Sequence, residues 1–359
     1  MTFDRDQPYN DLPALPPRVE LETKAVLKKA IAANRALAEL KRAGDLLPNQ
    51  TVLLSTLLLQ EAKQSSEIEN IVTTNDDLYH AFADDNLAAN QATKEVLHYN
   101  HALWFGFVSL KEGRPLSTRL FEDIASQVKG TGMAVRRLPG TKVGKSGGEV
   151  VYTPPEGEAL IRDKLANLEA FIHADDDLDP LVKLAVMHYQ FEAIHPFADG
   201  NGRTGRILNI LYLIDQQLLL LPILYLSRYI IEHKVAYYEG LQRVTEAGDW
   251  EGWLLYILQA VEVTALITRD RILAIRGLMA QVTERVRTEL PGIYSKDLVE
   301  ILFEQPYCKI RVLETAGIAK RQTASRYLQE LERIGILQAH RRGRETYYLN
   351  VPFYALLIQ

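Results

Sequence analysis

The chain has 359 residues, which is enough for two or three domains. Its content of 47% hydrophobic and 24% charged residues is ordinary for a globular protein, and its formal net charge of -5 argues against a nucleic-acid coat or a membrane-surface protein. Cys308 is the only cysteine, which excludes an intramolecular disulfide and a cysteine-based zinc site and fits a reducing cytoplasm.

The first part of the chain is predicted to be helical. Residues 1–7 are polar and lack the apolar core of a signal peptide. Residues 7–17 contain four prolines and are expected to form an extended arm. Apolar residues then recur at helical spacing, which predicts helices over 20–43, 50–68 and 90–108, and another opened by Pro115.

The composition of the sequence changes between Gly130 and Pro155. Glycines are frequent there, and the strand formers Val150, Val151 and Tyr152 follow them, so we expect a β-hairpin. Helices resume at about Gly157, over 181–193 and after Gly202. The most apolar stretch, 218–226, has only nine residues and contains Pro222, so we expect a buried helix end and no membrane partner.

The last seventy residues predict a separate module. Helices are expected over 293–303, 310–316 and 323–334, followed by a hairpin over 339–349 with Gly343 near its tip. Three helices and a basic hairpin are the outline of a winged helix. Residues 293–350 hold ten lysines and arginines against seven acidic residues, a balance of +3 in an acidic chain.

The stretch HPFADGNGRTGR, residues 195–206, has the chemistry of an anion site. Gly200 and Gly202 let a ligand approach the main chain, and the helix predicted after them directs its unpaired N–H groups and positive dipole end at that spot. Arg203 and Arg206 share one helix face and can grip separate phosphates. The plain alternative is a capped helix with solvated arginines.

Two further side chains suggest which chemistry a bound anion would undergo at this site. A carboxylate beside phosphate-binding groups makes sense as a ligand of Mg²⁺, and Asp199 lies directly before the glycines. His195 has an ordinary pKa near neutrality and is suited to take a proton from an attacking hydroxyl. The residues alone therefore suggest activation of a nucleophile next to a metal-bound nucleotide.

This segment resembles the motif His-x-Phe-x-[Asp/Glu]-Gly-Asn-Gly-Arg-x-x-Arg of the Fic (filamentation induced by cAMP) family, with every fixed position matched. The resemblance implies a helical core that binds Mg-ATP and transfers AMP to a Tyr, Ser or Thr hydroxyl of a target protein, with His195 as general base and Asp199 as metal ligand. It also implies a set of ATP contacts: Glu69, His195, Gly200, Asn201, Gly202, Arg203, Thr204, Gly205, Arg206 and Tyr238.

Three other segments are similar to parts of the same family. The hairpin with Val150, Val151 and Tyr152 resembles the flap on which the target docks by strand pairing. Tyr238 resembles an adenine-contacting tyrosine, although Thr245 stands where relatives often have Asn. Ser65-Ser-Glu-Ile-Glu69-Asn70 matches the inhibitory motif [Ser/Thr]-x-x-x-Glu-[Gly/Asn], which implies that Glu69 pairs with Arg206 and misplaces ATP.

The resemblance predicts a mainly α fold: a helical Fic core with a β-hairpin flap and a C-terminal winged-helix domain. We expect an N-terminal region over 1–110 that carries the inhibitory motif, a catalytic core over 111–275 and the winged helix over 288–359. ATP and a target protein are the expected partners, self-modification and a homodimer remain open, and a cytoplasmic location is expected.

Several alternatives remain at this point. A hydrolase could use His188, His195 and Asp199 as metal ligands, although their spacing fits no zinc pattern. A relative of the same family could remove AMP or transfer another nucleotide. A DNA-binding regulator could instead act through basic side chains of the C-terminal module, which are Lys320, Arg321, Arg326, Arg341, Arg342 and Arg344.

Overall fold

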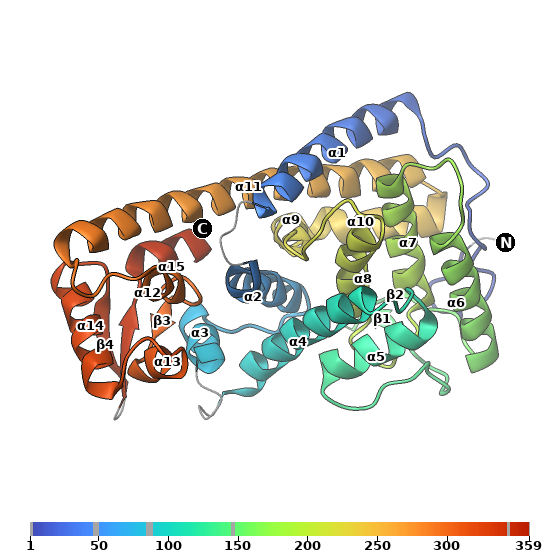
Figure 1. The fold of residues 1–359 in the computed structure, drawn as a ribbon. Helices are drawn as coiled ribbons and strands as arrows, with labels where there is room; N and C mark the ends of the chain where they lie inside the picture. The colour runs from blue at the N-terminus through green and yellow to red at the C-terminus, as the bar shows by residue number, and fades with distance from the viewer. Residues whose placement is uncertain (1–2, 46–49, 84–88, 145–147, 343–344, 359) are drawn as a thin grey trace.

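A computed structural model describes residues 3–45, 50–83, 89–144, 148–342 and 345–358. Helices dominate it, with one two-stranded and one three-stranded sheet among the described residues (Figure 1). The elements are α1 (Lys24–Gly44), α2 (Gln50–Ile68), α3 (Asn75–Ala83), α4 (Gln91–Lys111), α5 (Thr118–Lys129), β1 (Val143–Gly144), β2 (Val150–Tyr152), α6 (Glu158–Ile172), α7 (Pro180–Ile194), α8 (Asn201–Asp215), α9 (Leu226–Glu232), α10 (Lys234–Ala247), α11 (Trp250–Glu289), α12 (Lys296–Ile301), β3 (Tyr307–Cys308), α13 (Ile310–Thr315), α14 (Arg321–Arg333), β4 (Gln338–Arg342), β5 (Glu345–Leu349) and α15 (Val351–Ile358).

Two successive helices, α7 and α8, form the centre of the larger part. Every residue of α7 except Pro180 and Glu192 is buried, and every residue of α8 except Gly202 and Asp215. Asp179 caps α7, because its side chain accepts a hydrogen bond from Leu181 N and Pro180 needs no donor partner at the first helical position. The short turn between these helices is thus fixed by a core on both sides.

Helix α11 is the longest element and joins the two parts of the molecule (Figure 1). It packs along α1 and against α7, α9 and α10, and farther on against α12 and α15. By length and composition alone it could cross a membrane, but half of its most apolar 18-residue window is buried against the rest of the fold, as in the core helix of a soluble protein.

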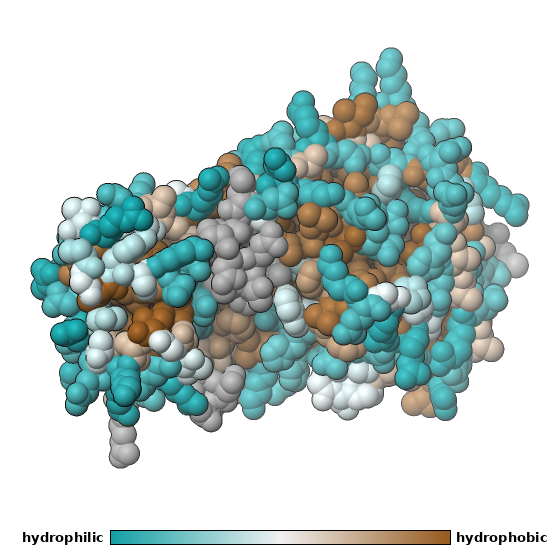
Figure 2. Space-filling view, viewed as in Figure 1, coloured by the Kyte–Doolittle hydropathy of each residue, from teal (hydrophilic) through white to brown (hydrophobic). Residues whose placement is uncertain are grey.

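The C-terminal part contains α12, β3, α13, α14, β4 and β5 in that order. Its antiparallel sheet has the strand order β3-β5-β4, with Tyr307 opposite Leu349 and Ala339 opposite Tyr348. This part contacts α3, where Asp76 accepts hydrogen bonds from the hydroxyls of Tyr307 at 2.9 Å and Tyr354 at 2.7 Å. Polar residues cover most of the face seen in Figure 2, and smaller apolar areas are visible on both the C-terminal part and the larger part.

The predicted fold class is confirmed: the protein is mainly helical, with a small hairpin and a small C-terminal sheet. The expected buried helix end over 218–226 is wrong, since α8 ends at Asp215 and an irregular buried segment leads to α9. Gln217 has a φ of 56°, and Pro222 lacks the N–H that a continued helix needs. Residues 276–287, between the second and third expected domains, belong to α11.

Helix boundaries also differ from the sequence expectation. The helix expected from Pro115 begins at Thr118, because Ser117 accepts a hydrogen bond from Leu120 N, and the one expected from Ile293 begins at Lys296, after the cap Ser295. The sequence patterns did not predict α3, α9, α10, α11, β3 or α15. The expected hairpin tip at Gly343 and the basic residue Arg344 lie outside the described residues.

Candidate active site

The site is built on the turn between α7 and α8. His195 ends α7 with a φ of 49°, and Gly200 precedes α8 with a φ of 77°. The side chain of Asn201 closes the turn, since its Oδ1 accepts from Phe197 N and its Nδ2 donates to Phe197 O, both at 2.8 Å. Phe197 is fully buried and anchors the turn in the core. In this structure the Asn201 amide shapes the loop that carries His195.

Arg206 lies one turn into α8 and is enclosed by the end of α2. Its Nε donates to Ser65 Oγ at 2.8 Å, and one terminal nitrogen donates to Ser65 O and to Glu69 Oε1, both at 2.9 Å. The arginine side chain is 1% exposed and that of Glu69 is 30% exposed. Burial opposes the charge, but Glu69 raises the pKa of Arg206, so the guanidinium stays protonated.

The Glu69 carboxylate also lies against the first turn of α8. A Cβ atom added at Gly202 would be 2.2 Å from Glu69 Oε1 and 2.9 Å from a terminal nitrogen of Arg206. Unpaired N–H groups and the positive dipole end of α8 meet at this point. The protein's own carboxylate therefore occupies the position where a helix N-terminus and an arginine together favour an anion.

The next three residues of α8, Arg203, Thr204 and Gly205, are also buried. Arg203 is 2% exposed, and its NH1 donates to Glu95 Oε2 of α4 at 3.0 Å. Thr204 is fully buried, and Gly205 packs so closely on Glu192 Oε1 that an added Cβ would lie 2.6 Å from it. Only a residue without a side chain fits at position 205.

His195 is held in the neutral form by its surroundings. Burial and the nearby Arg136 guanidinium lower the pKa of His195 to about 4, while a hydrogen bond with the Glu192 backbone opposes the shift. A neutral imidazole can accept a proton, so the environment suits a general base above that pH.

Arg136 was not anticipated from the sequence, and it joins this turn to the base of the hairpin. It donates to the carbonyl oxygens of His195 at 2.9 Å and Ile194 at 3.4 Å, and to that of Pro155, and it is 6% exposed. Three carbonyls that share one buried guanidinium fix the end of α7 relative to the residues after β2.

Replacing Arg136 with alanine is expected to lower the free energy of unfolding by about 3–5 kcal/mol, since three buried carbonyls lose a charged donor. The neighbouring Arg137 is a matched control, because its side chain is 75% exposed and pairs with Glu158 at 2.9 Å. Arg137→Ala should cost less than about 1 kcal/mol. Urea unfolding of both variants measures this; equal losses would contradict the structural role of Arg136.

Asp199 lies at the rim, with a side chain that is 60% exposed. Its Oδ1 accepts from Gly200 N and its Oδ2 from Lys129 Nζ, both at 2.6 Å. Burial raises the pKa of Asp199, but the bond to Lys129 outweighs it and the net shift is downward. The described residues contain no group of three or more His, Cys, Asp or Glu that could hold a metal ion.

The histidine of the alternative hydrolase proposal is engaged elsewhere. His188 Nε2 is 2.8 Å from Tyr237 Oη, and its ring stacks on Trp253. Burial lowers the pKa of His188 to about 3. This environment is that of a packed core histidine, and it favours no metal role.

The two tyrosines of α10 differ in exposure. Tyr237 is buried, whereas Tyr238 is 45% exposed. Arg206 and Glu69 are among the charges that shift the pKa of Tyr238, which burial raises to about 12. Both tyrosines are thus electrostatically coupled to Arg206, and Tyr238 is the one that is open to solvent. Thr245 is bonded to the hydroxyl of Tyr189 at 2.9 Å.

The predicted hairpin is present as β1 and β2, with Val143 opposite Tyr152 and Gly144 opposite Val150. All three residues of β2 are half-buried. The hydroxyl of Tyr152 donates to Ala193 O at 2.8 Å, and its ring packs near Phe3 and Tyr9. The side chain of Tyr152 thus anchors the hairpin to α7, which leaves the strand backbone as the surface for pairing.

A buried cluster behind Glu69 was also missed. Glu61 is fully buried and accepts hydrogen bonds from Tyr99 Oη at 3.1 Å, from Ser227 N at 3.1 Å and from the Ser227 hydroxyl. Burial raises the pKa of Glu61 to about 6. Glu61, Ser65 and Glu69 follow each other at intervals of four, so one polar face of α2 points at α8 and α9. The sequence held no clear signal for this cluster, because other polar residues stand between these positions, namely Lys63, Gln64, Ser66 and Glu67.

Fold and turn together define a helical protein whose central helix begins at a site built for an anion. Comparison with known proteins agrees with this class. Two family models described as "Fic/DOC family N-terminal" and "Fic/DOC family" match residues 27–108 and 107–213, and "Protein adenylyltransferase SoFic-like, C-terminal domain" matches residues 278–353. The chain belongs to the Fic/DOC family.

Individual relatives match over parts of their length. Protein adenylyltransferase fic-1 of Caenorhabditis elegans is 30% identical over 117 residues, which cover 32% of this chain and 21% of that protein. Protein adenylyltransferase Fic of Aedes aegypti is 26% identical over 230 residues, which cover 52% of this chain and 45% of that protein. The chain thus spans a fifth to about half of the length of these relatives.

Solved structures share the fold. A Fic family protein from Desulfovibrio desulfuricans G20 has a TM-score of 0.60 and 19% sequence identity, with 93% of this chain and 98% of that chain covered. Fic-1 (residues 134–508) from C. elegans has a TM-score of 0.55 and 21% identity, with 71% of this chain and 74% of that chain covered.

Proposed function

We propose that the chain transfers AMP from ATP to a hydroxyl group of a target protein, and that Glu69 holds this activity back. The observation that carries the proposal is the carboxylate of Glu69 at the N-terminus of α8, 2.9 Å from Arg206. An anion-binding position next to the neutral His195 suits a reaction in which phosphate and nucleophile meet.

The proposed reaction uses few groups. His195 accepts the proton of the target hydroxyl, whose oxygen attacks the α-phosphorus of ATP. The bond between the α-phosphorus and the bridging oxygen breaks, AMP stays on the target, and pyrophosphate leaves with the bonding electrons. The N–H groups at Gly200, Asn201 and Gly202 and the Arg203 guanidinium hold the α- and β-phosphates, with the γ-phosphate on Arg206, while Thr204 and Gly205 line the buried side of the same turn.

Asp199 is the proposed ligand of a Mg²⁺ ion bound with the nucleotide. Such an ion neutralises phosphate charge. The single exposed carboxylate at the mouth of the turn fits this use, and its lowered pKa keeps it ionised.

Ser65, Glu69 and Asn70 form the proposed inhibitory segment. With Glu69 in place, its carboxylate and a γ-phosphate compete for the same arginine, so ATP cannot settle with its α-phosphorus at the hydroxyl. Asn70 supports the helix end with a φ of 62° and accepts a bond from Lys234 Nζ at 3.3 Å. The release of Glu69 would then set the rate.

The same proposal gives the hairpin and α10 their roles. A target segment would pair with the backbone of β2 at Val150, Val151 and Tyr152, which brings its hydroxyl beside α7. Tyr238, half-exposed at the border of the site, would pack on the adenine.

Position-labelled ATP tests the reaction type. The Glu69→Gly variant is incubated with a lysate and with ATP labelled at the α- or the γ-phosphate. AMP transfer leaves label on protein from the α-labelled substrate alone, because the γ-phosphate departs in pyrophosphate. Kinases of the lysate label proteins from the γ-position whether or not this chain acts, so the same lysate without the variant is the control. A rise in γ-label above that control, with no rise in α-label, would show phosphorylation and would refute the proposal.

We also propose the three regions 1–110, 111–275 and 288–359, a cytoplasmic location, self-modification and a homodimer, none of which depends on that test. The alternative activity, removal of AMP, would release AMP from a modified target protein. The helix and strand order of the C-terminal part suits a winged helix, with exposed Lys320, Arg321, Arg326 and Arg341 available to DNA phosphates; only the backbone of Arg342 is described, as part of β4.

A further inference from the structure

Lys129 holds the carboxylate that the proposed function assigns to the metal. Its Nζ lies 2.6 Å from Asp199 Oδ2, and its side chain is 22% exposed. The other oxygen of Asp199 already accepts from Gly200 N at 2.6 Å. Both oxygens of the carboxylate are therefore engaged within the protein, and one of them is engaged by a cation.

The contact is supported along the whole lysine side chain. A Cβ added at Gly200 would lie 3.3 Å from Cδ and 3.5 Å from Cγ of Lys129, so the aliphatic stem packs on the turn. Lys129 is the last residue of α5, and the left-handed Gly130, with a φ of 65°, ends the helix directly after it. The ammonium group is thus delivered by a fixed helix end, not by a free surface side chain.

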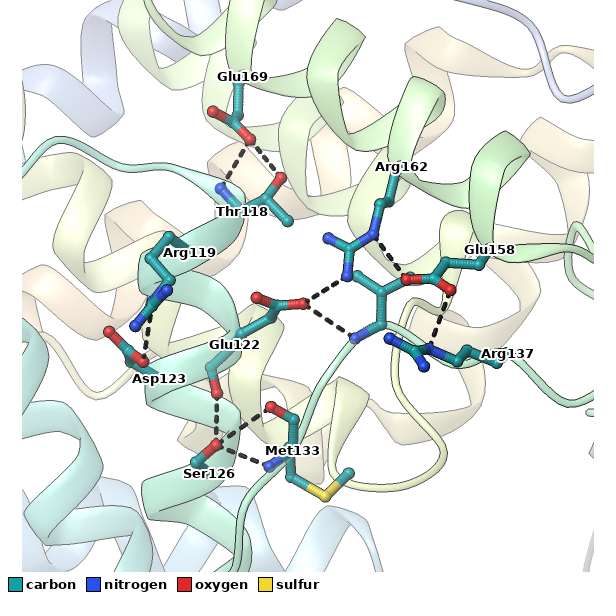
Figure 3. A network of polar contacts seen from close by, with 11 residues as sticks. Thr118, Arg119, Glu122, Asp123, Ser126, Met133, Arg137, Glu158, Arg162 and Glu169 are labelled. Atoms are coloured by element: carbon teal, nitrogen blue, oxygen red, sulfur yellow. Dashed lines mark hydrogen bonds and ion pairs between the residues drawn. The ribbon is translucent and has the colours of Figure 1, made fainter.

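Helix α5 itself is tied to the segment before the hairpin (Figure 3). Ser126 Oγ accepts from Met133 N at 2.8 Å, and Glu122 Oε1 accepts from Val135 N at 3.1 Å and from Arg162 at 3.2 Å. These contacts lie within one or two turns of Lys129. They fix the end of α5, and with it Lys129, against residues 133–135 and α6.

An ammonium and a divalent cation at one carboxylate repel each other, so each weakens the binding of the other. We propose that Lys129 is a positioning residue: it orients the Asp199 carboxylate before a divalent cation arrives and must yield that carboxylate when the cation binds. This inference rests on the proposed function. It implies that Lys129 raises the Mg²⁺ concentration at which the site takes up Mg-ATP.

The test measures binding, with the full-length Glu69→Gly protein as parent. The dissociation constant of ATP is determined by calorimetry in EDTA and at saturating Mg²⁺. The constant in EDTA divided by the constant in Mg²⁺ gives a ratio, which is compared between variants. Because ATP binds Mg²⁺ in solution identically in every experiment, differences in this ratio belong to the protein.

Lys129→Met keeps the stem and removes the charge. Its ratio should exceed that of the parent about fivefold, in keeping with the loss of one partly exposed ion pair. Lys111→Met is the matched control, since Lys111 is likewise the last residue of its helix, α4, and lies sixteen residues beyond Glu95. Its ratio should equal that of the parent. Thermal unfolding checks that both variants are folded, and Lys129→Gln replaces Lys129→Met if the latter is not.

The Asp199→Asn variant tests the metal role of Asp199 separately from the positioning role of Lys129. It should reduce the ratio strongly. If Asp199→Asn does so but Lys129→Met matches the parent or falls below it, the role of Lys129 is overturned and the proposed function stands. If the parent binds no ATP, or if Asp199→Asn leaves the ratio unchanged, the metal role of Asp199 and the inference fail together.

Discussion

Glycine at position 69 is expected to raise the rate of AMP transfer, including self-modification, by about ten- to a hundredfold. The range corresponds to a typical coupling free energy between a bound group and a site. The physical reason is that the carboxylate leaves the N-terminus of α8 and no longer accepts from the terminal nitrogen of Arg206 that it otherwise holds at 2.9 Å, which leaves this nitrogen with its bond to Ser65 O. Initial rates of protein labelling from α-labelled ATP measure the effect.

The change to glycine also weakens the end of α2, and this needs a control. Glu67 lies two residues earlier, in the last turn of α2, and pairs with Lys63 at 3.1 Å, not with the site. Glu67→Gly loosens the end of α2 at least as much as Glu69→Gly, because Glu67 lies within the helix, where glycine costs about 1 kcal/mol, and Glu69 directly follows it. It should leave the labelling rate close to that of the wild type. A similar rise in both variants would mean that loosening of α2, and not the carboxylate, controls the activity.

Alanine at position 195 is expected to lower the transfer rate of the Glu69→Gly protein by about a hundred- to ten-thousandfold, the usual contribution of a general base. ATP affinity should change little, because the imidazole acts on the hydroxyl and not on the phosphates. His101→Ala on α4 is the control, since His101 is exposed. A rate that survives His195→Ala would remove His195 from the chemistry.

The pH dependence should reflect the shielded imidazole. The pKa of His195 is lowered to about 4, so the base form prevails at neutral pH and the rate should not halve near the ordinary value of 6.5. The folded state disfavours protonation of His195, and of His188 with a pKa of about 3. The two neutral histidines therefore contribute fully to the free energy of unfolding above pH 6.5. This contribution is lost as the pH falls from 6.5 toward their lowered pKa values. Unfolding must therefore be followed at each pH.

Much of this site could be predicted because its chemistry is contiguous in the sequence. The turn from His195 to Arg206 carries its own glycines, anchor and arginines, and the four-residue spacing of Ser65 and Glu69 fixes one helix face. Helix α7, which Asp179 caps, was also predicted within one residue at each end, and α2 has the bounds that its periodicity predicted.

The remainder depends on tertiary contacts that leave no local pattern. Arg136 matters because three carbonyls converge on it, and Glu61 because Tyr99 and Ser227 come from other helices. Lys129 is an ordinary helix-terminal lysine until the fold brings Asp199 to it. The prediction of a helix end over 218–226 was wrong for a different reason. Apolar content indicates burial but does not by itself distinguish a helix from a packed loop.

A double-mutant cycle of Glu69→Gly and Arg206→Ala tests the central claim most directly. If Glu69 acts by occupying Arg206, its removal accelerates label transfer only where Arg206 is present, so the two effects are strongly non-additive. In the Arg206→Ala protein, Glu69→Gly should leave the low rate unchanged. An equal acceleration in both backgrounds would contradict the claim, because Glu69 would then restrain the enzyme by a route that does not involve Arg206.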